Sequence, residues 1–277
     1  MSISILFVPI LASFFVTLFI IPFWIRKAKQ IGLVWTDINK LNSQKVAGSG
    51  GIMAMCGFVV GVLLYIAYVV FILANYNSHL IETLALLSVI LILTGVGLVD
   101  DLLGWRKGGL SRRSRIIMVC FAAIPLIVIN AGKSIVAIPF IGTIDLGLIY
   151  PLIIIPIGII GATTTFNFLA GFNGLEAGQG ILLLTASALV SYFMGNSWLS
   201  VIALCMVASL IAFIFYNFDP AIVFPGDSLT YSVGGLIAAV SILGNFERVA
   251  VFFFIPYIIE FVLKTRGRLI KQSFGKP

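Results

Sequence analysis

The chain has 277 residues, of which 61% are hydrophobic and 10% charged, and its formal net charge is +7 at pH 7. This charged fraction and a mean hydropathy of +1.17 exclude a soluble globular domain. The longest polar segment, residues 26–51, is about one loop long. We therefore expect the chain, residues 1–277, to form a single membrane-embedded domain.

Apolar runs of about 17 to 25 residues predict membrane-spanning helices, and their number predicts an all-α, polytopic bundle of about nine such helices. The first run lacks a basic segment before it and a small-residue cleavage site after it, and Arg26, Lys27 and Lys29 follow. We therefore interpret it as the first helix rather than as a cleavable signal. The nine runs lie at residues 3–25, 52–75, 80–99, 115–131, 147–164, 180–195, 198–216, 228–244 and 248–264.

Basic residues gather on one side of this arrangement. The first loop, the third loop and the segment after the ninth helix hold 15 of the 17 Lys and Arg residues, which leaves Lys133 and Arg248 for the other side. The positive-inside rule then predicts an external N-terminus and a cytoplasmic C-terminus. The same charges would attract anionic lipid head groups. Nucleic-acid binding is not expected, because no soluble module and no basic stripe with interleaved aromatic residues is present.

Two cytoplasmic segments carry more carboxylates than helix ends require. In "GLVDDLLGWRKGGLSRRSR" (97–115), the adjacent Asp100 and Asp101 repel each other unless a cation shares them. A solvated helix end balanced by the basic residues downstream is the alternative. In "YNFDPAIVFPGDS" (216–228), Asp227 precedes an apolar helix, where it could serve simply as a cap. Capping leaves the aromatic residues and prolines before it unexplained.

A third segment, "FNFLAGFNGLEAGQG" (166–180), lies between two apolar runs. Its Gly174 and Gly178 could serve helix packing. Packing does not require Asn167, Asn173 and Glu176, which are costly near hydrocarbon unless they bind something or each other.

These three segments predict a particular chemistry. Oxygen ligands with arginine and lysine nearby suit a Mg²⁺-diphosphate. The three cysteines lie inside apolar runs and the single histidine, His79, lies in a loop on the other side, so zinc and iron sites are not expected. The residues alone therefore indicate a magnesium-dependent, phosphate-handling enzyme at the cytoplasmic face.

The segments resemble those of the polyprenyl-phosphate N-acetylhexosamine-1-phosphate transferases, and most closely the eukaryotic and archaeal branch that makes dolichyl-diphospho-GlcNAc. The matching pieces span nearly the whole chain in the family's order, and "AGFNGLEAGQ" is the most specific part. They are "TDINK" (36–40), "DD" (100–101), "NFLAGFNGLEAGQ" (167–179), "NFDPAIVFPGD" (217–227) and "RGR" (266–268).

The resemblance implies roles at the matching positions. Asn167 and Asp227 look like the ligands of Mg²⁺, with Mn²⁺ as an alternative ion. Asn173 resembles the residue that recognises uracil, and Phe224 the aromatic residue that packs against that base. Glu176 joins them as a substrate-binding candidate.

Three further positions are catalytic candidates by the same resemblance. Asp100 and Asp101 look like the paired aspartates near the phosphates, and which of them acts as a base stays open. Arg115 aligns where the family usually has a lysine; it keeps the charge but cannot carry a proton near pH 7. The remaining substrate-binding candidates, from the first and last cytoplasmic loops, are Asp37, Lys40, Arg266 and Arg268.

The implied reaction is attack by a lipid phosphate oxygen on the β-phosphorus of UDP-GlcNAc with release of UMP, the first step of N-glycan-type lipid-linked oligosaccharide assembly. The expected partners are UDP-GlcNAc, polyprenyl or dolichyl phosphate and membrane lipids, with a homodimer as an optional assembly. An archaeal plasma membrane is the expected location, or the endoplasmic reticulum in a eukaryote.

The chain departs from the family pattern at several places. "VAGSGG" (46–51) stands where relatives often have a proline and an acidic residue, and "RGR" has glycine where relatives carry histidine. The family generally has ten spanning helices, so a final tenth helix is expected to be absent.

Alternatives to this transferase remain at this point. One is a transporter that uses the cytoplasmic-face Asp and Asn residues, although transporters place such groups near the midplane and show repeats. Another is a family member that uses a different UDP-N-acetylhexosamine. A CDP-alcohol phosphotransferase is disfavoured because its aspartate-rich signature is missing.

Overall fold

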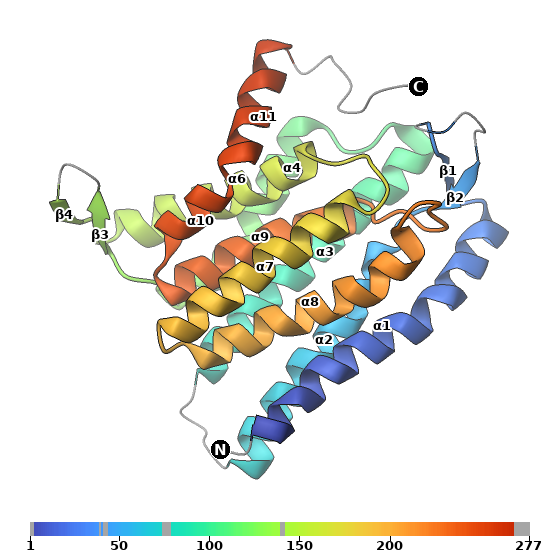
Figure 1. Cartoon of the computed structure of the whole chain (residues 1–277). Coiled ribbons are helices and arrows are strands. Elements are labelled where there is room, and N and C mark those ends of the chain that lie inside the picture. Colours follow the sequence, from blue (N-terminus) through green and yellow to red (C-terminus); the bar gives the residue numbers. More distant parts are fainter. Residues whose placement is uncertain (1–2, 39, 41–43, 74–78, 139–141, 269–277) are drawn as a thin grey trace.

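The computed structural model describes residues 3–38, 40, 44–73, 79–138 and 142–268. It is a helical bundle with two short hairpins (Figure 1). The helices are α1 (Ile3–Ile31), α2 (Gly51–Ala67) with the π-helix η1 (Tyr68–Ile72), α3 (Leu80–Lys107), α4 (Arg112–Ala122), α5 (Ile124–Val128), the π-helix η2 (Tyr150–Ile154) with α6 (Ile155–Phe168), α7 (Leu175–Phe193), α8 (Ser197–Asn217), α9 (Asp227–Gly244), α10 (Glu247–Phe253) and α11 (Ile255–Arg266). The basic residues Lys271 and Lys276 lie outside the described residues.

Seven helices in the described part of the chain are long and apolar enough to cross a membrane, which confirms a polytopic membrane protein. They correspond to seven of the nine predicted runs. The other two runs, 115–131 and 248–264, are not single continuous helices, so the predicted count of nine spanning helices is not confirmed. The first is divided into α4 and α5 and the second into α10 and α11. Pro125 and Pro256 lie in the first turns of α5 and α11, and a proline lacks the N–H that would continue the preceding helix.

Helix α9 is the centre of the bundle, since 89% of its 18 residues are buried. It packs against α3 and α6 and also contacts α2, α7, α8 and α10. Small residues allow this close approach. A Cβ atom on Gly234 would lie 2.7 Å from the carbonyl oxygen of Ala162 in α6. Helix α9 is therefore held firmly, and its first residue, Asp227, has a fixed position.

Two antiparallel hairpins lie at opposite ends of the bundle (Figure 1). One pairs β1 (Val34–Thr36) with β2 (Lys45–Ala47), and the other pairs β3 (Ile135–Ile138) with β4 (Gly142–Asp145). The β1–β2 hairpin is joined to the segment before α9, because Phe224 donates its backbone N–H to the Ala47 carbonyl at 2.7 Å. Segments distant in the sequence therefore meet at this end of the molecule.

Candidate active site

A cavity of about 680 Å³ lies between the β1–β2 hairpin and the adjacent ends of α3, α6, α7 and α9. It brings together nine of the twelve site residues predicted from the sequence. Trp35, Phe172, Asn217 and Thr230 also line it, although the sequence analysis did not select them. The predicted residues in its lining are Asp37, Asp100, Asp101, Arg115, Asn167, Asn173, Glu176, Phe224 and Asp227.

The two predicted metal ligands meet at one point of this cavity. Asn167, in the last turn of α6, donates its side-chain N–H to Asp227 Oδ1 at 2.6 Å and to Thr230 Oγ1 at 2.8 Å. Thr230 lies one turn beyond Asp227 in α9, a helical spacing that could have identified it from the sequence. The amide and the carboxylate are therefore close enough to share one small ligand.

Asp101 orders the start of α9. Its Oδ1 accepts the backbone N–H of Asp227 at 2.7 Å, and its Oδ2 accepts that of Ser228 at 3.4 Å. Both N–H groups belong to the first turn, where a helix has no internal acceptors for them. Gly226 has φ +72°, and a Cβ atom there would lie 2.3 Å from Asp101 Oδ2. Only glycine lets this carboxylate approach, so Asp101 and Gly226 together position Asp227.

Asp100 faces a different set of partners. Its Oδ1 accepts the Leu110 N–H at 2.8 Å and an Arg115 Nη2–H at 3.0 Å. Its Oδ2 accepts the Tyr231 hydroxyl at 3.1 Å and lies 2.5 Å from Arg115 Nε. The carboxylate is 2% exposed and engaged on all sides. In this arrangement Asp100 orients Arg115 and Tyr231 through three hydrogen bonds and an ion pair.

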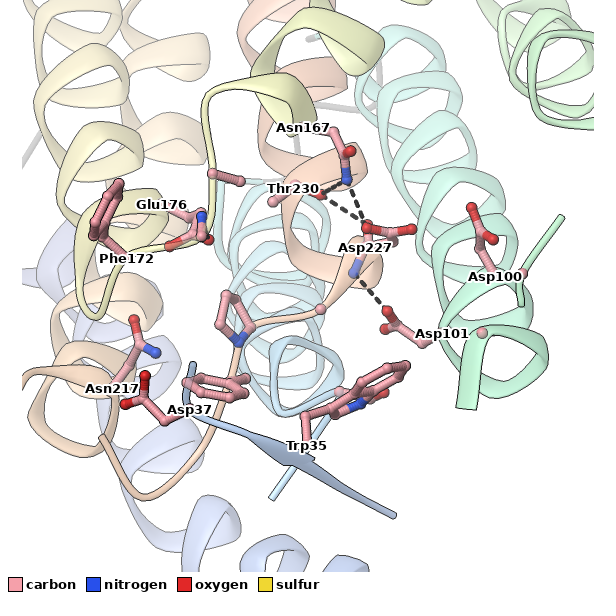
Figure 2. A pocket seen from close by; sticks show the side chains of 18 of the residues that line it. Trp35, Asp37, Asp100, Asp101, Asn167, Phe172, Glu176, Asn217, Asp227 and Thr230 are labelled. Carbon is pink, nitrogen blue, oxygen red and sulfur yellow. Dashed lines mark hydrogen bonds between the residues drawn. The ribbon is translucent and has the colours of Figure 1, made fainter. Parts of the chain in front are cut away.

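The other side of the cavity holds amide, aromatic and carboxylate side chains. Figure 2 shows Asp37, Phe172, Glu176 and Asn217 there, and Asp100 and Asp101 on the opposite side beyond Asp227. Asn173 connects this side to the segment after β1, because its Nδ2 donates a hydrogen bond to Asp37 Oδ2 with an N···O distance of 3.0 Å. We call the side that holds the adjacent aspartates Asp100 and Asp101 the carboxylate side, and the side that holds Asn173 and Asn217 the amide side.

Asn217, at the end of α8, braces the loops that form the amide side. Its Oδ1 accepts the Gly174 N–H at 3.1 Å, and its Nδ2 donates to the Val223 carbonyl at 2.9 Å. The residue is fully buried. The loop after α6 and the loop before α9 are thus fixed to one side chain.

Three predicted site residues are not brought into the cavity lining. Lys40 forms an ion pair with Asp219 across the two loops, and this pairing holds the pKa of the Asp219 carboxyl below its ordinary value. Arg266 and Arg268 are exposed at and just beyond the end of α11, which projects from the bundle in Figure 1. Their role in binding the diphosphate stays a prediction.

A second cavity, of about 370 Å³, adjoins the first between α4, α6, α9 and α11. Arg115 and Asn167 line both cavities. Two further basic residues line the second one, Arg112 and Lys264. Lys264 donates to the Phe168 carbonyl at 2.5 Å and lies 4.7 Å from the centre of the Phe168 ring. The second cavity therefore combines positive charge with aromatic surface.

The remaining walls of the second cavity include Ile116, Val119 and Phe261, and Tyr231 also lines it. The sequence analysis missed Lys264 and Tyr231 as site residues. Tyr231 stands four residues after Asp227, so helical spacing could have found it. Lys264 lies next to "RGR", but only the fold shows that it turns towards α6. We call this second cavity the side groove.

The donor set of the main cavity fits a magnesium ion. All candidate ligands near Asn167 are oxygen atoms of carboxylate, amide or hydroxyl groups, the type that Mg²⁺ prefers. Among the described residues, no group of three or more His, Cys, Asp or Glu side chains could hold a metal alone. A site with few protein ligands suits Mg²⁺, which commonly keeps waters and shares substrate phosphate oxygens.

The chain is similar to known proteins over most of its length. Residues 83–245 match the model of glycosyl transferase family 4. Two archaeal relatives carry the provisional name UDP-N-acetylglucosamine–dolichyl-phosphate N-acetylglucosaminephosphotransferase. The protein from Saccharolobus solfataricus is 37% identical over 100% of this chain and 83% of its own length. The protein from Sulfolobus acidocaldarius is 34% identical over 96% and 80%.

A eukaryotic relative has the same name without that qualification. The protein from Dictyostelium discoideum is 29% identical over 92% of this chain and 69% of its own length. The archaeal and eukaryotic matches thus agree with each other in the activity that they name.

Proposed function

The chain belongs to glycosyl transferase family 4, and on that premise we propose that it transfers N-acetylglucosamine 1-phosphate from UDP-N-acetylglucosamine to a polyprenyl or dolichyl phosphate. A lipid phosphate oxygen forms the new bond to the β-phosphorus, and the bond from that phosphorus to UMP breaks. The products are UMP and polyprenyl-diphospho-GlcNAc, the first intermediate of lipid-linked oligosaccharide assembly. Membership of a transferase family makes the chain an enzyme, so the transporter alternative is not retained.

The observation that carries this proposal is the junction of the two cavities at Arg115 and Asn167. A transferase that joins a soluble donor to a lipid acceptor needs two adjoining sites, one polar and one open to apolar chains. The polar groups of the main cavity are mainly carboxylates and amides, whereas those of the side groove are mainly basic and lie among apolar residues. We assign the donor to the main cavity and the acceptor to the side groove.

In the main cavity, the amide side would take the uridine and the carboxylate side the diphosphate. About 680 Å³ lies within the usual range for small-molecule sites. Asn173 can both donate to and accept from a base, and Phe224 offers a ring to pack against it. Asn167 and Asp227 would hold Mg²⁺. When bound, that ion would offset the negative charge of the diphosphate and of the departing UMP.

In the side groove, Arg112, Arg115 and Lys264 would hold the acceptor phosphate while its chain runs along Ile116 and Phe261. A lipid monophosphate is largely dianionic at neutral pH, since its second pKa is about 6. It can attack without a strong base. The enzyme would act mainly by placing two anions in line and offsetting their repulsion, and Asp100 would contribute by orienting Arg115.

We further propose that the two broken pairs, α4–α5 and α10–α11, also cross the membrane. This gives nine crossings with the N-terminus outside, and it places both cavities at the cytoplasmic face, where the donor nucleotide is available. An archaeal plasma membrane is the proposed location. The variants Ser2→Cys and Lys276→Cys test this orientation with a membrane-impermeant thiol reagent. We expect the first to react in intact cells and the second only after the cells are opened. Equal reaction of both in intact cells contradicts the orientation.

The activity is tested with purified protein in lipid nanodiscs, radiolabelled UDP-GlcNAc, a polyprenyl phosphate and Mg²⁺. We expect UMP and a labelled lipid in equal amounts. Asp227→Ala should abolish both. Asp145→Ala is the matched control, because Asp145 is an exposed carboxylate in the β3–β4 hairpin, at the opposite end of the bundle from the β1–β2 hairpin. Absence of a lipid product, or a product unaffected by Asp227→Ala, would refute the proposal.

Two additional measurements refine it. Initial rates with UDP-GlcNAc, UDP-GalNAc and UDP-MurNAc-pentapeptide identify the donor, and we expect the first to be fastest. Lys264→Gln should raise the KM for polyprenyl phosphate and leave that for UDP-GlcNAc unchanged. A raised KM for both substrates would contradict the separation of donor and acceptor sites.

A further inference from the structure

Trp35 is an aromatic residue of the main cavity to which the proposed reaction assigns no role. It lies in the middle of β1 and lines the cavity. The residue is 39% exposed, which is unusual for a large aromatic side chain that is not in contact with lipid. A ligand in the main cavity can therefore reach its ring.

The indole of Trp35 is held in place by backbone on two sides. A Cβ atom on Gly48 would lie 2.6 Å from both Cδ1 and Nε1 of the ring, and one on Gly104 would lie 3.7 Å from its Cη2. The five-membered part of the indole therefore rests on the segment after β2, and the six-membered part reaches the last turn of α3. A ring that is already fixed loses little conformational freedom when a ligand binds to it.

The end of the main cavity beside Trp35 is bounded mainly by glycine. Gly104, Gly108 and Gly109 line the cavity, and the Cα atom of Gly109 lies 4.0 Å from the position of a Cβ atom on Gly104. A Cβ atom on Gly108 would meet no atom of the described residues within 4 Å. This end therefore offers open space next to an aromatic ring, with few side chains to fill it.

The order of the groups in the donor decides which of them reaches this end. Uracil is assigned to the amide side, and the diphosphate to the Mg²⁺ ligands Asn167 and Asp227. Figure 2 shows Asp227 between the amide side and Asp101, and Gly104 lies one turn after Asp101 in α3. In UDP-GlcNAc the sugar follows the diphosphate. A donor that starts at the amide side and passes Asp227 therefore brings its sugar to the end that holds Gly104 and Trp35.

The hexosamine ring matches an indole surface on one of its faces. In α-linked N-acetylglucosamine every ring substituent except the phosphate is equatorial, and the phosphate is axial on one face. The opposite face therefore presents only C–H groups. The face of an aromatic ring is negatively polarised and attracts such hydrogen atoms. In N-acetylgalactosamine the hydroxyl on C4 is axial on this same face and would hold the sugar away from the ring.

We propose that the indole of Trp35 stacks on the hexosamine ring of the donor, and that this contact makes the enzyme select N-acetylglucosamine over its C4 epimer N-acetylgalactosamine. The inference rests on the proposed function, since it takes a UDP-N-acetylhexosamine as the donor. Gly48 and Gly104 are part of the same arrangement, because their missing side chains leave room for the indole. Trp35 is thus a specificity-determining residue for the sugar.

Equilibrium binding to the protein in nanodiscs, with Mg²⁺ and without a lipid acceptor, separates the sugar from the rest of the donor. UDP carries the base, the ribose and the diphosphate, and UDP-GlcNAc adds the sugar. We expect Trp35→Ala to weaken the binding of UDP-GlcNAc about 10-fold, as for loss of an aromatic contact and its buried apolar area. The same variant should change the binding of UDP by less than about twofold. Trp35→Phe keeps a smaller ring, so its loss for UDP-GlcNAc should be about threefold.

A second measurement compares the two epimers in the UMP-release assay. We expect the wild type to prefer UDP-GlcNAc to UDP-GalNAc on the order of 10-fold, and Trp35→Ala to reduce this preference to about twofold or less. Trp105→Phe is the control variant. Trp105 precedes Arg106 in the last turn of α3, outside the cavity lining, and the Arg106 guanidinium lies 5.1 Å from the centre of its ring. This variant should keep the wild-type binding and preference.

The two measurements separate a sugar contact from a structural role of Trp35. Equal weakening of UDP and UDP-GlcNAc in both Trp35 variants overturns the inference, as does an unchanged preference between the epimers in both. A wild type that does not distinguish the epimers overturns it as well. A wild type that releases no UMP from UDP-GlcNAc refutes the proposed function itself, whereas an active wild type with unaltered Trp35 variants refutes only the sugar contact.

Discussion

Replacing Asp101 distinguishes a structural from a chemical role for this carboxylate. In the structure it accepts the N–H groups of Asp227 and Ser228 and so caps α9. Asparagine caps helices about as well as aspartate, whereas alanine cannot. We therefore predict that Asp101→Asn keeps UMP release within about 10-fold of the wild type, and that Asp101→Ala loses more.

The magnitude follows from the two hydrogen bonds. Removing an N-cap side chain costs about 0.5 to 2 kcal/mol, and about 1.4 kcal/mol corresponds to a factor of ten. If the whole cost falls on the position of Asp227, Asp101→Ala slows the reaction by about 2- to 30-fold at fixed Mg²⁺. Asp101→Asn keeps the 2.7 Å bond to Asp227 and loses only the longer one, of 3.4 Å, to Ser228.

The assay measures UMP release in nanodiscs over a range of Mg²⁺ concentrations, with the thermal unfolding midpoint of each variant recorded in parallel. For Asp101→Ala we expect a higher Mg²⁺ requirement, because its neighbour Asp227 is the proposed ligand. Asp100→Asn is the contrasting variant, since an amide there would turn an N–H group towards Arg115 or Tyr231. A folded Asp101→Asn that is as inactive as Asp101→Ala at saturating Mg²⁺ would refute the capping argument.

Three further predictions concern the same region. Gly226→Ala should lower both the thermal unfolding midpoint and the rate of UMP release, because its Cβ would lie 2.3 Å from Asp101 Oδ2 and the backbone strain alone is about 1 to 3 kcal/mol. Gly178→Ala is the control, since a Cβ there meets open space. Equal effects of the two substitutions contradict the reasoning. Tyr231→Phe should lower kcat by about 10-fold or more, as for loss of a hydrogen bond to a charged group, with an unchanged KM for UDP-GlcNAc; an unaltered kcat argues against it. Chelation with EDTA should stop UMP release, and excess Mg²⁺ should restore it; activity that persists in EDTA rules out a magnesium requirement.

The helices were largely predictable because their signal is local. An apolar run long enough to cross a membrane is visible in the sequence wherever it occurs, and seven of the nine runs became helices of that kind. The two breaks were also encoded locally, by Pro125 and Pro256, but an interpretation based on hydropathy alone passed over them. The hairpins were not predicted, since strands of three or four residues carry too few side chains to show a period.

The identity of most cavity residues was also accessible from the sequence. Asn167, Asn173 and Asp227 are costly near hydrocarbon, so their presence between apolar runs indicated a site. The resemblance to a known family added their expected roles. The position of Arg266 and Arg268 was not accessible in this way, because it depends on the direction that α11 takes after its break.

The sequence by itself determined that this is a polytopic membrane protein and which oxygen ligands are available, since composition, run length and residue type are local properties. Only the tertiary structure decided how the paired aspartates divide their work. Adjacent residues on a helix point about 100° apart, so Asp100 faces Arg115 and Tyr231 while Asp101 faces the start of α9. The partners in α9, Asp227 and Tyr231, are 126 and 131 residues away in the chain, and only the packing of α3 against α9 brings them into contact with the aspartates.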